Sequence, residues 1–141
     1  MKTRIFYDGL KFRLKGWKKT EEVIGEIIIK ENRLPGDINI IITSDNVVKD
    51  LNNNFLKHNY YTDVITFDYN KENIVNGEIY ISLDRVRKNS INYKVSLKDE
   101  VLRVMFHGIL HLCGYKDERM KEKKEMRAKE DEWLKYFSRK Y

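Results

Sequence analysis

Strands and helices are mixed along the sequence, which predicts one α/β or α+β domain spanning residues 1–141. Apolar residues recur every three to four positions in some segments, as in helices, and alternate in others, as in half-buried strands. The length suits a single core rather than two. No linker, internal repeat or low-complexity tract divides the chain, which contains one proline.

The first half of the chain is expected to run strand, helix, strand, helix. Residues 4–8 can form a short strand, and residues 17–31 place apolar side chains at helical spacing. Residues 38–43 are rich in isoleucine and are expected to form a second strand. Ser44 can then cap a helix. The apolar face of that helix would consist of Val47, Leu51 and Phe55.

The second half is expected to hold two more strands and two helices. Residues 63–69 and 79–83 both alternate and should pair as strands around a turn near residues 76–77. On the first of these strands, one side would carry Ile65, Phe67 and Tyr69. Residues 97–113 are apolar nearly all round a helical wheel, which predicts a buried helix. Residues 118–141 mix both charge signs and should form a surface helix.

Composition narrows the class of protein. The chain has 28 Lys and Arg against 22 Asp and Glu, a net charge of +6, which favours an anionic partner such as nucleic acid. A solvated basic surface without a partner would have the same charge. The single cysteine, Cys113, excludes an internal disulfide framework and a cysteine-rich zinc finger. With no targeting or membrane-spanning segment expected, we predict a cytoplasmic protein.

Two histidines on the predicted buried helix form a candidate metal site. His107 and His111 are four residues apart, so both imidazoles project from one face of the helix. Gly114 allows the helix to end and the chain to turn back. Asp117 can then approach the two histidines and complete an H-x3-H-x5-D pattern. Arg103 lies one turn earlier on the same stripe.

Imidazole and carboxylate are good ligands for zinc. Three of them leave a fourth position open, as in catalytic rather than structural zinc sites. The same spacing occurs in metzincin proteases, but these have a catalytic Glu where this chain has Gly108. Two core histidines that only satisfy local hydrogen bonds are the alternative interpretation. Cys113 is expected to be a small buried hydrophobic residue, because it points across the helix from His111.

A polar and aromatic segment follows the second predicted helix. It contains Lys57, Tyr60, Tyr61 and Thr62 after a run of three asparagines. Aromatic rings can stack on bases and lysine can contact phosphates, so the segment is a candidate for RNA binding. A solvated helix end fits the composition equally well. His58, in the same segment, is expected to be exposed.

Residues 107–117, HGILHLCGYKD, resemble the signature HGxLHLxGYDH of the YbeY family of bacterial rRNA maturation factors. Upstream, residues 51–56 resemble the family's LNxxYR, residues 61–67 its PTDVLSF and residues 77–82 its GDIxIS. Downstream, residues 124–130 resemble the family's E-x-x-M-x-x-x-E helix. The resemblance runs in order from about Pro35 to the C-terminus.

The resemblance implies an α+β domain with a mixed, mostly antiparallel four-stranded sheet packed with helices. It implies one zinc ion at the buried helix, held by His107, His111 and Asp117, and single-strand endoribonuclease activity in 16S rRNA 3′-end maturation and ribosome quality control. The expected partner is rRNA of the small ribosomal subunit, with no membrane. The mechanism we expect is metal-assisted hydrolysis of a phosphodiester bond.

The chain departs from the family pattern at four places, one of them Tyr61, which stands where PTDVLSF has proline. Asp117 replaces the third histidine, which adds negative charge and would admit manganese or another divalent metal. Leu56 stands where LNxxYR has arginine, and Lys57 beside it could supply charge but not a bidentate grip on phosphate. Arg103 replaces a further family histidine. We therefore take Arg103 and Lys57 as candidate catalytic cations.

Two other functions fit parts of the sequence. A non-catalytic ribosome-assembly factor with a structural metal would retain the ligands and lack the arginine. A small metalloprotease would share the histidine spacing, but Gly108 supplies no general base. A DNA-binding module is the poorest match, because no helix-turn-helix or zinc-finger pattern is present.

Overall fold

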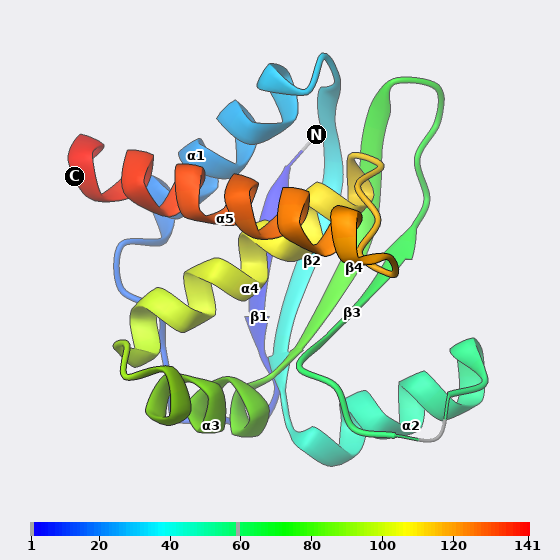
Figure 1. Ribbon diagram of the computed structural model, residues 1–141. Coiled ribbons are helices and arrows are strands. Elements are labelled where there is room, and N and C mark those ends of the chain that lie inside the picture. The colour runs from blue at the N-terminus through cyan, green and yellow to red at the C-terminus, as the bar shows by residue number, and fades with distance from the viewer. Residues whose placement is uncertain (1, 59) are drawn as a thin grey trace.

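The computed structural model describes residues 2–58 and 60–141, and their path is shown in Figure 1. Helices and strands are mixed in one α+β domain, as the sequence predicts. In chain order the elements are β1 (Thr3–Tyr7), α1 (Trp17–Lys30), β2 (Leu34–Thr43), α2 (Asp45–Leu56), β3 (Val64–Asp68), β4 (Ile74–Ser82), α3 (Leu83–Tyr93), α4 (Leu97–Leu112) and α5 (Met120–Lys140). No helix among the described residues is long and apolar enough to cross a bilayer.

The described strands form one mixed sheet of four, in the order β1-β2-β4-β3. The mixed four-stranded sheet is confirmed, but the expectation that it is mostly antiparallel is wrong. β2 runs parallel to both β1 and β4, and only the β3–β4 pair is antiparallel. The reason is that α1 returns the chain to the end of the sheet where β1 began, so β2 starts in the same direction as β1. Only β3 and β4 are joined by a short turn.

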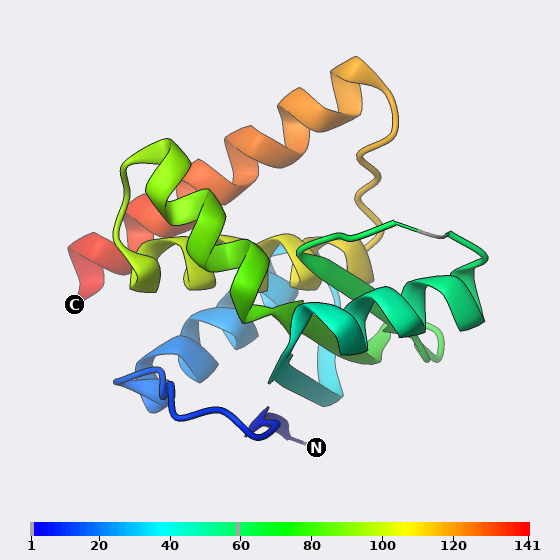
Figure 2. The same cartoon turned by 90° about the horizontal axis from the view of Figure 1, so that it is seen from below.

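Helix α4 lies in the centre of the core, as the sequence predicts for residues 97–113. One face of α4 packs on the sheet, α1 packs on α4 and β2, and α5 lies over α4 and α1 (Figures 1 and 2). The sheet presents fully buried isoleucines to this helix layer, namely Ile38, Ile40, Ile42, Ile79 and Ile81. From α5, the buried side chains are Met126, Trp133 and Phe137. Helix α5, which the sequence predicts to lie at the surface, therefore covers the core with one of its faces.

Strand β3 turns its two sides to different environments. Ile65 and Phe67 share a side, as predicted, but that side faces α2, where the Phe67 ring meets Phe55 at a centroid distance of 5.9 Å. In the antiparallel register, Val64 and Thr66 stand opposite the core residues Ile81 and Ile79. The β3 side chains on the α4 side of the sheet are thus those of Val64 and Thr66, and not those of Ile65 and Phe67.

Three local predictions differ from the structure. The β3–β4 turn lies at residues 69–73, and Gly77 is inside β4, so the Asn-Gly pair does not mark the turn. Helix α2 has its cap at Ser44 as expected, but it buries Val48 and Asn52 instead of the predicted apolar face. Helix α3 was not predicted. Leu83 was assigned to a strand, whereas Ser82 caps a helix that begins there, its hydroxyl accepting from the Arg85 N–H at 3.2 Å.

Gly77 should tolerate no side chain, because a Cβ there would lie 2.6 Å from the Phe67 carbonyl oxygen of the neighbouring strand. We expect Gly77→Ala to lower the free energy of unfolding by about 1–3 kcal/mol, measured by urea denaturation. Gly25→Ala in α1 is the matched control, since nothing lies within 4 Å of its Cβ. That change should raise stability by about 0.5–1 kcal/mol. Equal effects of the two substitutions would contradict this account.

Candidate metal centre

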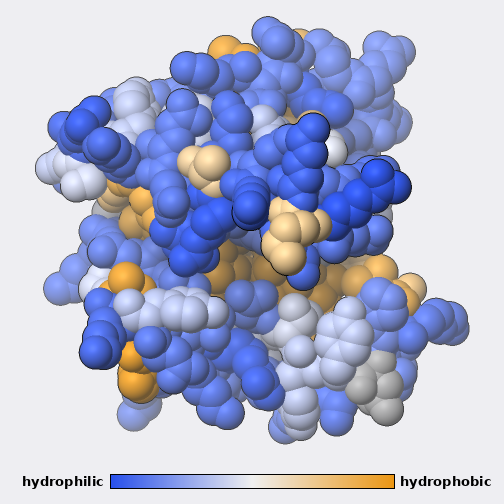
Figure 3. Space-filling view, viewed as in Figure 1, coloured by the Kyte–Doolittle hydropathy of each residue, from blue (hydrophilic) through white to orange (hydrophobic). Residues whose placement is uncertain are grey.

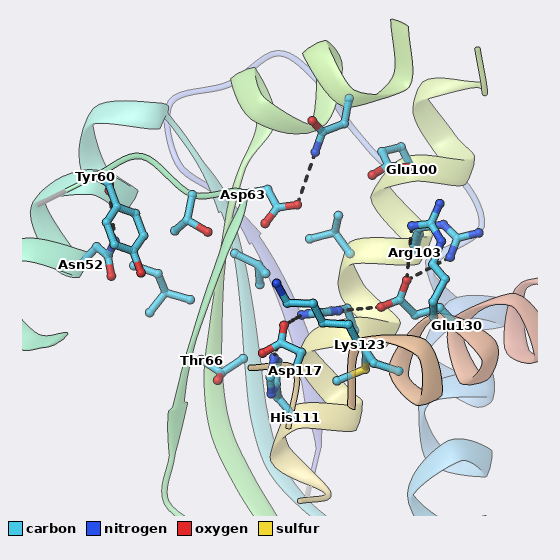
Figure 4. A pocket seen from close by; sticks show the side chains of 18 of the residues that line it. Asn52, Tyr60, Asp63, Thr66, Glu100, Arg103, His111, Asp117, Lys123 and Glu130 are labelled. Carbon is cyan, nitrogen blue, oxygen red and sulfur yellow. Dashed lines mark hydrogen bonds and ion pairs between the residues drawn. The ribbon is translucent and has the colours of Figure 1, made fainter. Parts of the chain in front are cut away.

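His107, His111 and Asp117 come together at one end of a cavity beside α4 (Figure 4). The Nε2 atoms of His107 and His111 lie 3.2 Å and 3.3 Å from Asp117 Oδ2. Each residue offers one ligand atom, and these atoms all lie within 4.8 Å of one another. The structure thus brings together all three residues that the sequence predicts, in a group that could hold a metal ion.

The end of α4 explains how Asp117 reaches the two histidines. Gly114 adopts a φ of +107°, which turns the chain sharply after the helix. The backbone N–H groups of Gly114 and Tyr115 donate to the carbonyls of His111 and Leu110, at 2.9 Å and 3.0 Å. These bonds satisfy helix carbonyls that would otherwise lack partners. Asp117 follows three residues after the turn.

Both imidazoles are oriented through their second ring nitrogen. His107 Nδ1 donates to Glu130 Oε2 at 2.6 Å, and His111 Nδ1 donates to the Tyr115 carbonyl at 2.9 Å. A proton on each Nδ1 leaves the lone pair of each Nε2 directed at Asp117 and available to a metal. Carboxylate and carbonyl partners of this kind are the usual outer shell of metal-binding histidines. The donor set therefore fits a zinc-like divalent ion.

Arg103, expected to be a catalytic cation, faces α5. Its guanidinium donates to Glu130 Oε1 at 2.9 Å and to Asp131 Oδ1 at 2.6 Å. Both oxygens of the Glu130 carboxylate are thereby used, one by Arg103 and one by His107. The Glu130 side chain is only 5% exposed, so its charge needs these partners. Arg103 lines the cavity wall, and its contacts hold the group that orients His107.

The electrostatics of the centre favour a cation. Burial disfavours the charged form of His107, but the hydrogen bond and charge of Glu130, with the charges of Asp117 and Asp63, raise the pKa of this imidazole above its ordinary value. Acidic groups therefore dominate the potential around the Nε2 atoms. In the apo protein they favour a proton on His107, and a divalent cation would benefit from the same field.

The cavity beside the ligands has a volume of about 510 Å³. Figure 3 shows this face of the molecule hollowed below α5, with apolar residues visible in the hollow. Among the predicted site residues, Arg103, Tyr60 and Thr62 line the cavity with the three metal-ligand candidates. Lys57 and Tyr61 are not among its lining residues. Lys57 ends α2 in the left-handed conformation, with φ +60°, and its side chain is exposed.

Several charged residues of the cavity were given no role by the sequence, among them Asp63 and Lys123. Asp63 lies in the stretch that resembles PTDVLSF. Asn89 Nδ2 donates to its carboxylate at 3.3 Å, and burial raises the pKa of this carboxyl group although His107 opposes the shift. Lys123, on the exposed side of α5, lines the cavity at the end where Asp117 lies (Figure 4). No local pattern could have identified it, because its role depends on how α5 crosses α4.

Position 108 faces the sheet and not the cavity. A Cβ on Gly108 would lie 2.9 Å from Ile79 Cγ2, so the close approach of α4 to β4 requires a glycine. A protease base at this position is therefore absent for a packing reason. Cys113 is a buried core residue, as predicted, and burial raises the pKa of its thiol to about 12. His58 is exposed, as predicted.

The family model described as Endoribonuclease YbeY matches residues 10–138 of the chain. The chain belongs to the YbeY endoribonuclease family. A relative named Endoribonuclease YbeY from Flavobacterium psychrophilum is 46% identical over 114 residues, or 81% of each chain. Another relative of that name, from Karelsulcia muelleri, is 39% identical over 136 residues, or 96% of each chain.

A solved structure has the same fold. The solution structure of a protein from Thermotoga maritima is 35% identical, with a TM-score of 0.64 over 96% of this chain and 88% of that one. The YbeY relatives and this likeness together extend over nearly all of the described elements. Membership of the YbeY family places the chain among nucleases that hydrolyse RNA, and the candidate metal group lies within the matched region.

Loss of the Glu130 charge should weaken metal binding. We expect Glu130→Gln to lower the affinity for zinc by about 10- to 100-fold, because His107 loses a partner that orients it and makes it more basic. Competition with a coloured chelator measures the affinity directly. Glu132→Gln is the matched control on the same helix, since Glu132 is exposed and its ion-pair partner among the described residues is Lys129, at 3.5 Å. Equal affinities of both variants would refute the orienting role.

Glu100 should destabilise the fold at neutral pH. It is 4% exposed, and burial raises the pKa of its carboxyl group although Arg103 opposes the shift. A raised folded-state pKa means that stability is present below the unfolded pKa and is lost as pH rises through the folded one. Glu100→Gln should therefore raise the free energy of unfolding at pH 7 and do so less at pH 4, in urea titrations against exposed Glu72→Gln. A gain that does not depend on pH would contradict this.

Proposed function

We propose that the protein is a metal-dependent, single-strand-specific endoribonuclease that uses zinc and acts in the cytoplasm on the 3′ end of 16S rRNA in the small ribosomal subunit. The observation that carries the proposal is the convergence of two imidazole Nε2 atoms and one carboxylate oxygen at the end of an open cavity. The rRNA substrate is supported by the family resemblance. The net charge of +6 suits a polyanionic partner.

The ligand set supports a catalytic rather than a closed metal site. With three protein ligands, a divalent ion would keep an open position, and there it would supply Lewis acidity and acidify water. Asp117 adds an oxygen ligand and a negative charge to the two imidazoles. We therefore propose zinc as the principal ion and manganese as an alternative. Cys113, whose thiol is buried in the core, takes no part in the site.

Other side chains of the cavity can support phosphodiester hydrolysis. Asp63 presents a carboxylate whose pKa is raised by burial, which makes it a stronger proton acceptor than an exposed aspartate. Lys123 presents an ammonium group at the metal end of the cavity, where negative charge grows on the phosphate (Figure 4). We assign Arg103 a positioning role through Glu130. Contact between Lys57 and backbone phosphates outside the cavity stays a prediction.

The position of the centre supports a single-stranded substrate. Its ligand atoms lie at a cavity wall beneath α5, and only a flexible strand can bend a phosphate into such a hollow. A stacked duplex holds its phosphates on a rigid surface, and proteins recognise it mostly by shape. The same geometry gives access to a base that has been unstacked from its neighbours.

Cleavage of a single-stranded RNA oligonucleotide by highly purified protein tests the proposal. We expect cleavage to stop with chelator, to return with zinc or manganese, and to fall at least about 100-fold in His111→Ala and Asp117→Ala, because each change removes a ligand. Asp50→Ala, an exposed carboxylate on α2, is the control and should retain full activity. A duplex of the same sequence should be cut poorly.

Two results would contradict the nuclease proposal. Equal cleavage in the wild type, the chelated sample and both ligand variants would indicate a contaminating nuclease. A protein that binds metal and RNA but cuts no RNA would be an assembly factor. If chelation also lowers the melting temperature, the metal stabilises the fold as well, because a ligand that binds only the native state stabilises it.

A further inference from the structure

We propose that the arm of the cavity between α2 and β3 is a nucleobase-binding subsite, in which the base next to the cleaved phosphate stacks on Tyr60. The inference rests on the proposed nuclease function for the identity of the strand that enters the cavity. It adds a binding site with its own chemistry, one that recognises an unstacked base through ring contact and not through charge.

The cavity is divided between a wall rich in charged side chains, both acidic and basic, and an arm without lysine, arginine or carboxylate. Among its described lining residues, the lysine and arginines are Arg103, Lys123 and Arg127, all from α4 and α5. The arm contributed by α2 and the loop after it is lined by Asn52, Leu56, His58, Tyr60 and Thr62. Figure 4 shows Asn52 and Tyr60 at the end of the cavity opposite Lys123. A nucleotide is divided in the same way, with a charged phosphate and an uncharged base.

Tyr60 offers an aromatic ring that is already held in place. Its side chain is 55% exposed although the residue lines the cavity. The His58 ring stacks on it, with centroids 5.2 Å apart and an angle of 17° between the planes. The Tyr60 hydroxyl and His58 Nδ1 are 3.0 Å apart and share a hydrogen bond. The two rings therefore support each other, and a base can extend the stack without first ordering a mobile side chain.

A buried amide holds this aromatic pair in place. Asn52 is 2% exposed, and its Nδ2 donates to the Tyr60 carbonyl at 3.0 Å. A buried amide on the inner face of a helix is costly unless it is paired, so this bond fixes the loop to α2. Leu56, which stands where the YbeY pattern has arginine, contributes apolar surface to the same arm. Thr62 and Thr66 add hydroxyls that can donate to or accept from any base edge.

The neighbouring tyrosine, Tyr61, packs against cationic side chains. Lys49 Nζ lies 4.5 Å from the centre of the Tyr61 ring, and the Arg85 guanidinium lies 4.6 Å from it. Arg85 is itself held by Asp45, at 3.1 Å. Tyr61 thus anchors the loop outside the cavity, and Tyr60 is the ring left to meet a base. Both were predicted to bind RNA, and the structure gives that geometry to Tyr60 alone of the two.

Binding of a single-stranded RNA oligonucleotide that carries one 2-aminopurine tests the subsite. With chelator present to prevent cleavage, the wild-type chain should bind the probe and quench its fluorescence by stacking. Tyr60→Ala should weaken binding roughly 5- to 150-fold, the range for loss of one base–aromatic stack, and abolish the quench. Tyr60→Phe should retain both, because it keeps the ring. Tyr69→Ala, an exposed tyrosine outside the cavity lining, should match the wild type.

Cleavage rates distinguish this inference from the nuclease proposal. With metal present, Tyr60→Ala should lose kcat/KM on an intact oligonucleotide, and the loss should vanish when the base at the quenched position is replaced by an abasic nucleotide. If Tyr60→Ala equals the wild type in quench and in rate, the subsite is refuted while the nuclease stands. If the wild type quenches the probe but cuts no RNA, the subsite stands and the nuclease proposal fails. Unchanged melting temperatures show that the variants fold.

Discussion

The Glu130 carboxylate is buried between two helices, and the functional end of the molecule depends on how it is satisfied. One of its oxygens accepts from His107 on α4 and the other from Arg103 one turn earlier. An unpaired charge at this depth would cost about 3–5 kcal/mol, so α5 can pack on α4 only in the position that completes both bonds. The same contact orients a metal-ligand candidate and places Lys123 at the edge of the cavity.

This arrangement makes packing and chemistry inseparable at α4. The helix is apolar on the side that meets β4, where Gly108 permits close contact with Ile79. Its opposite side carries Arg103, His107 and His111 at successive turns, toward α5 and the cavity. Groups with high desolvation costs are therefore gathered on one stripe, where each has a partner. The contacts of Glu130 with Arg103 and His107 therefore both stabilise the packing of the helices and orient a metal-ligand candidate.

The cavity combines acidic and basic groups, and some of them pair with one another. Carboxylates of Asp63, Asp117 and Glu130 surround the imidazoles and attract a cation, while Lys123 stands near the rim. The arm that holds Tyr60 presents no such charge, so the two ends of the cavity suit the two parts of a nucleotide.

Much of the site was predictable because it is local in the chain. Histidines four residues apart share a helix face whatever the fold, and Gly114 ends that helix three residues before Asp117. The parts that could not be predicted involve residues far apart in sequence. Glu130 is 23 positions from His107, and Asp63 is 26 positions from Asn89. Helical and strand periodicity contain no information about such pairs.

The amino-acid sequence by itself determined the metal-ligand candidates, the buried helix that carries them and the mixture of strands and helices, because these depend on spacing within single elements. Tertiary structure decided that β2 runs parallel to both neighbours, since crossover connections and not strand patterns set direction. It also directed Arg103 to Glu130 and placed Tyr60 at the cavity but Tyr61 against Arg85, because only packing selects the partner that each side chain meets. The three metal-ligand candidates thus follow from spacing within a short stretch of sequence. The side chains around them, which could make them a catalytic site, are brought there by the fold.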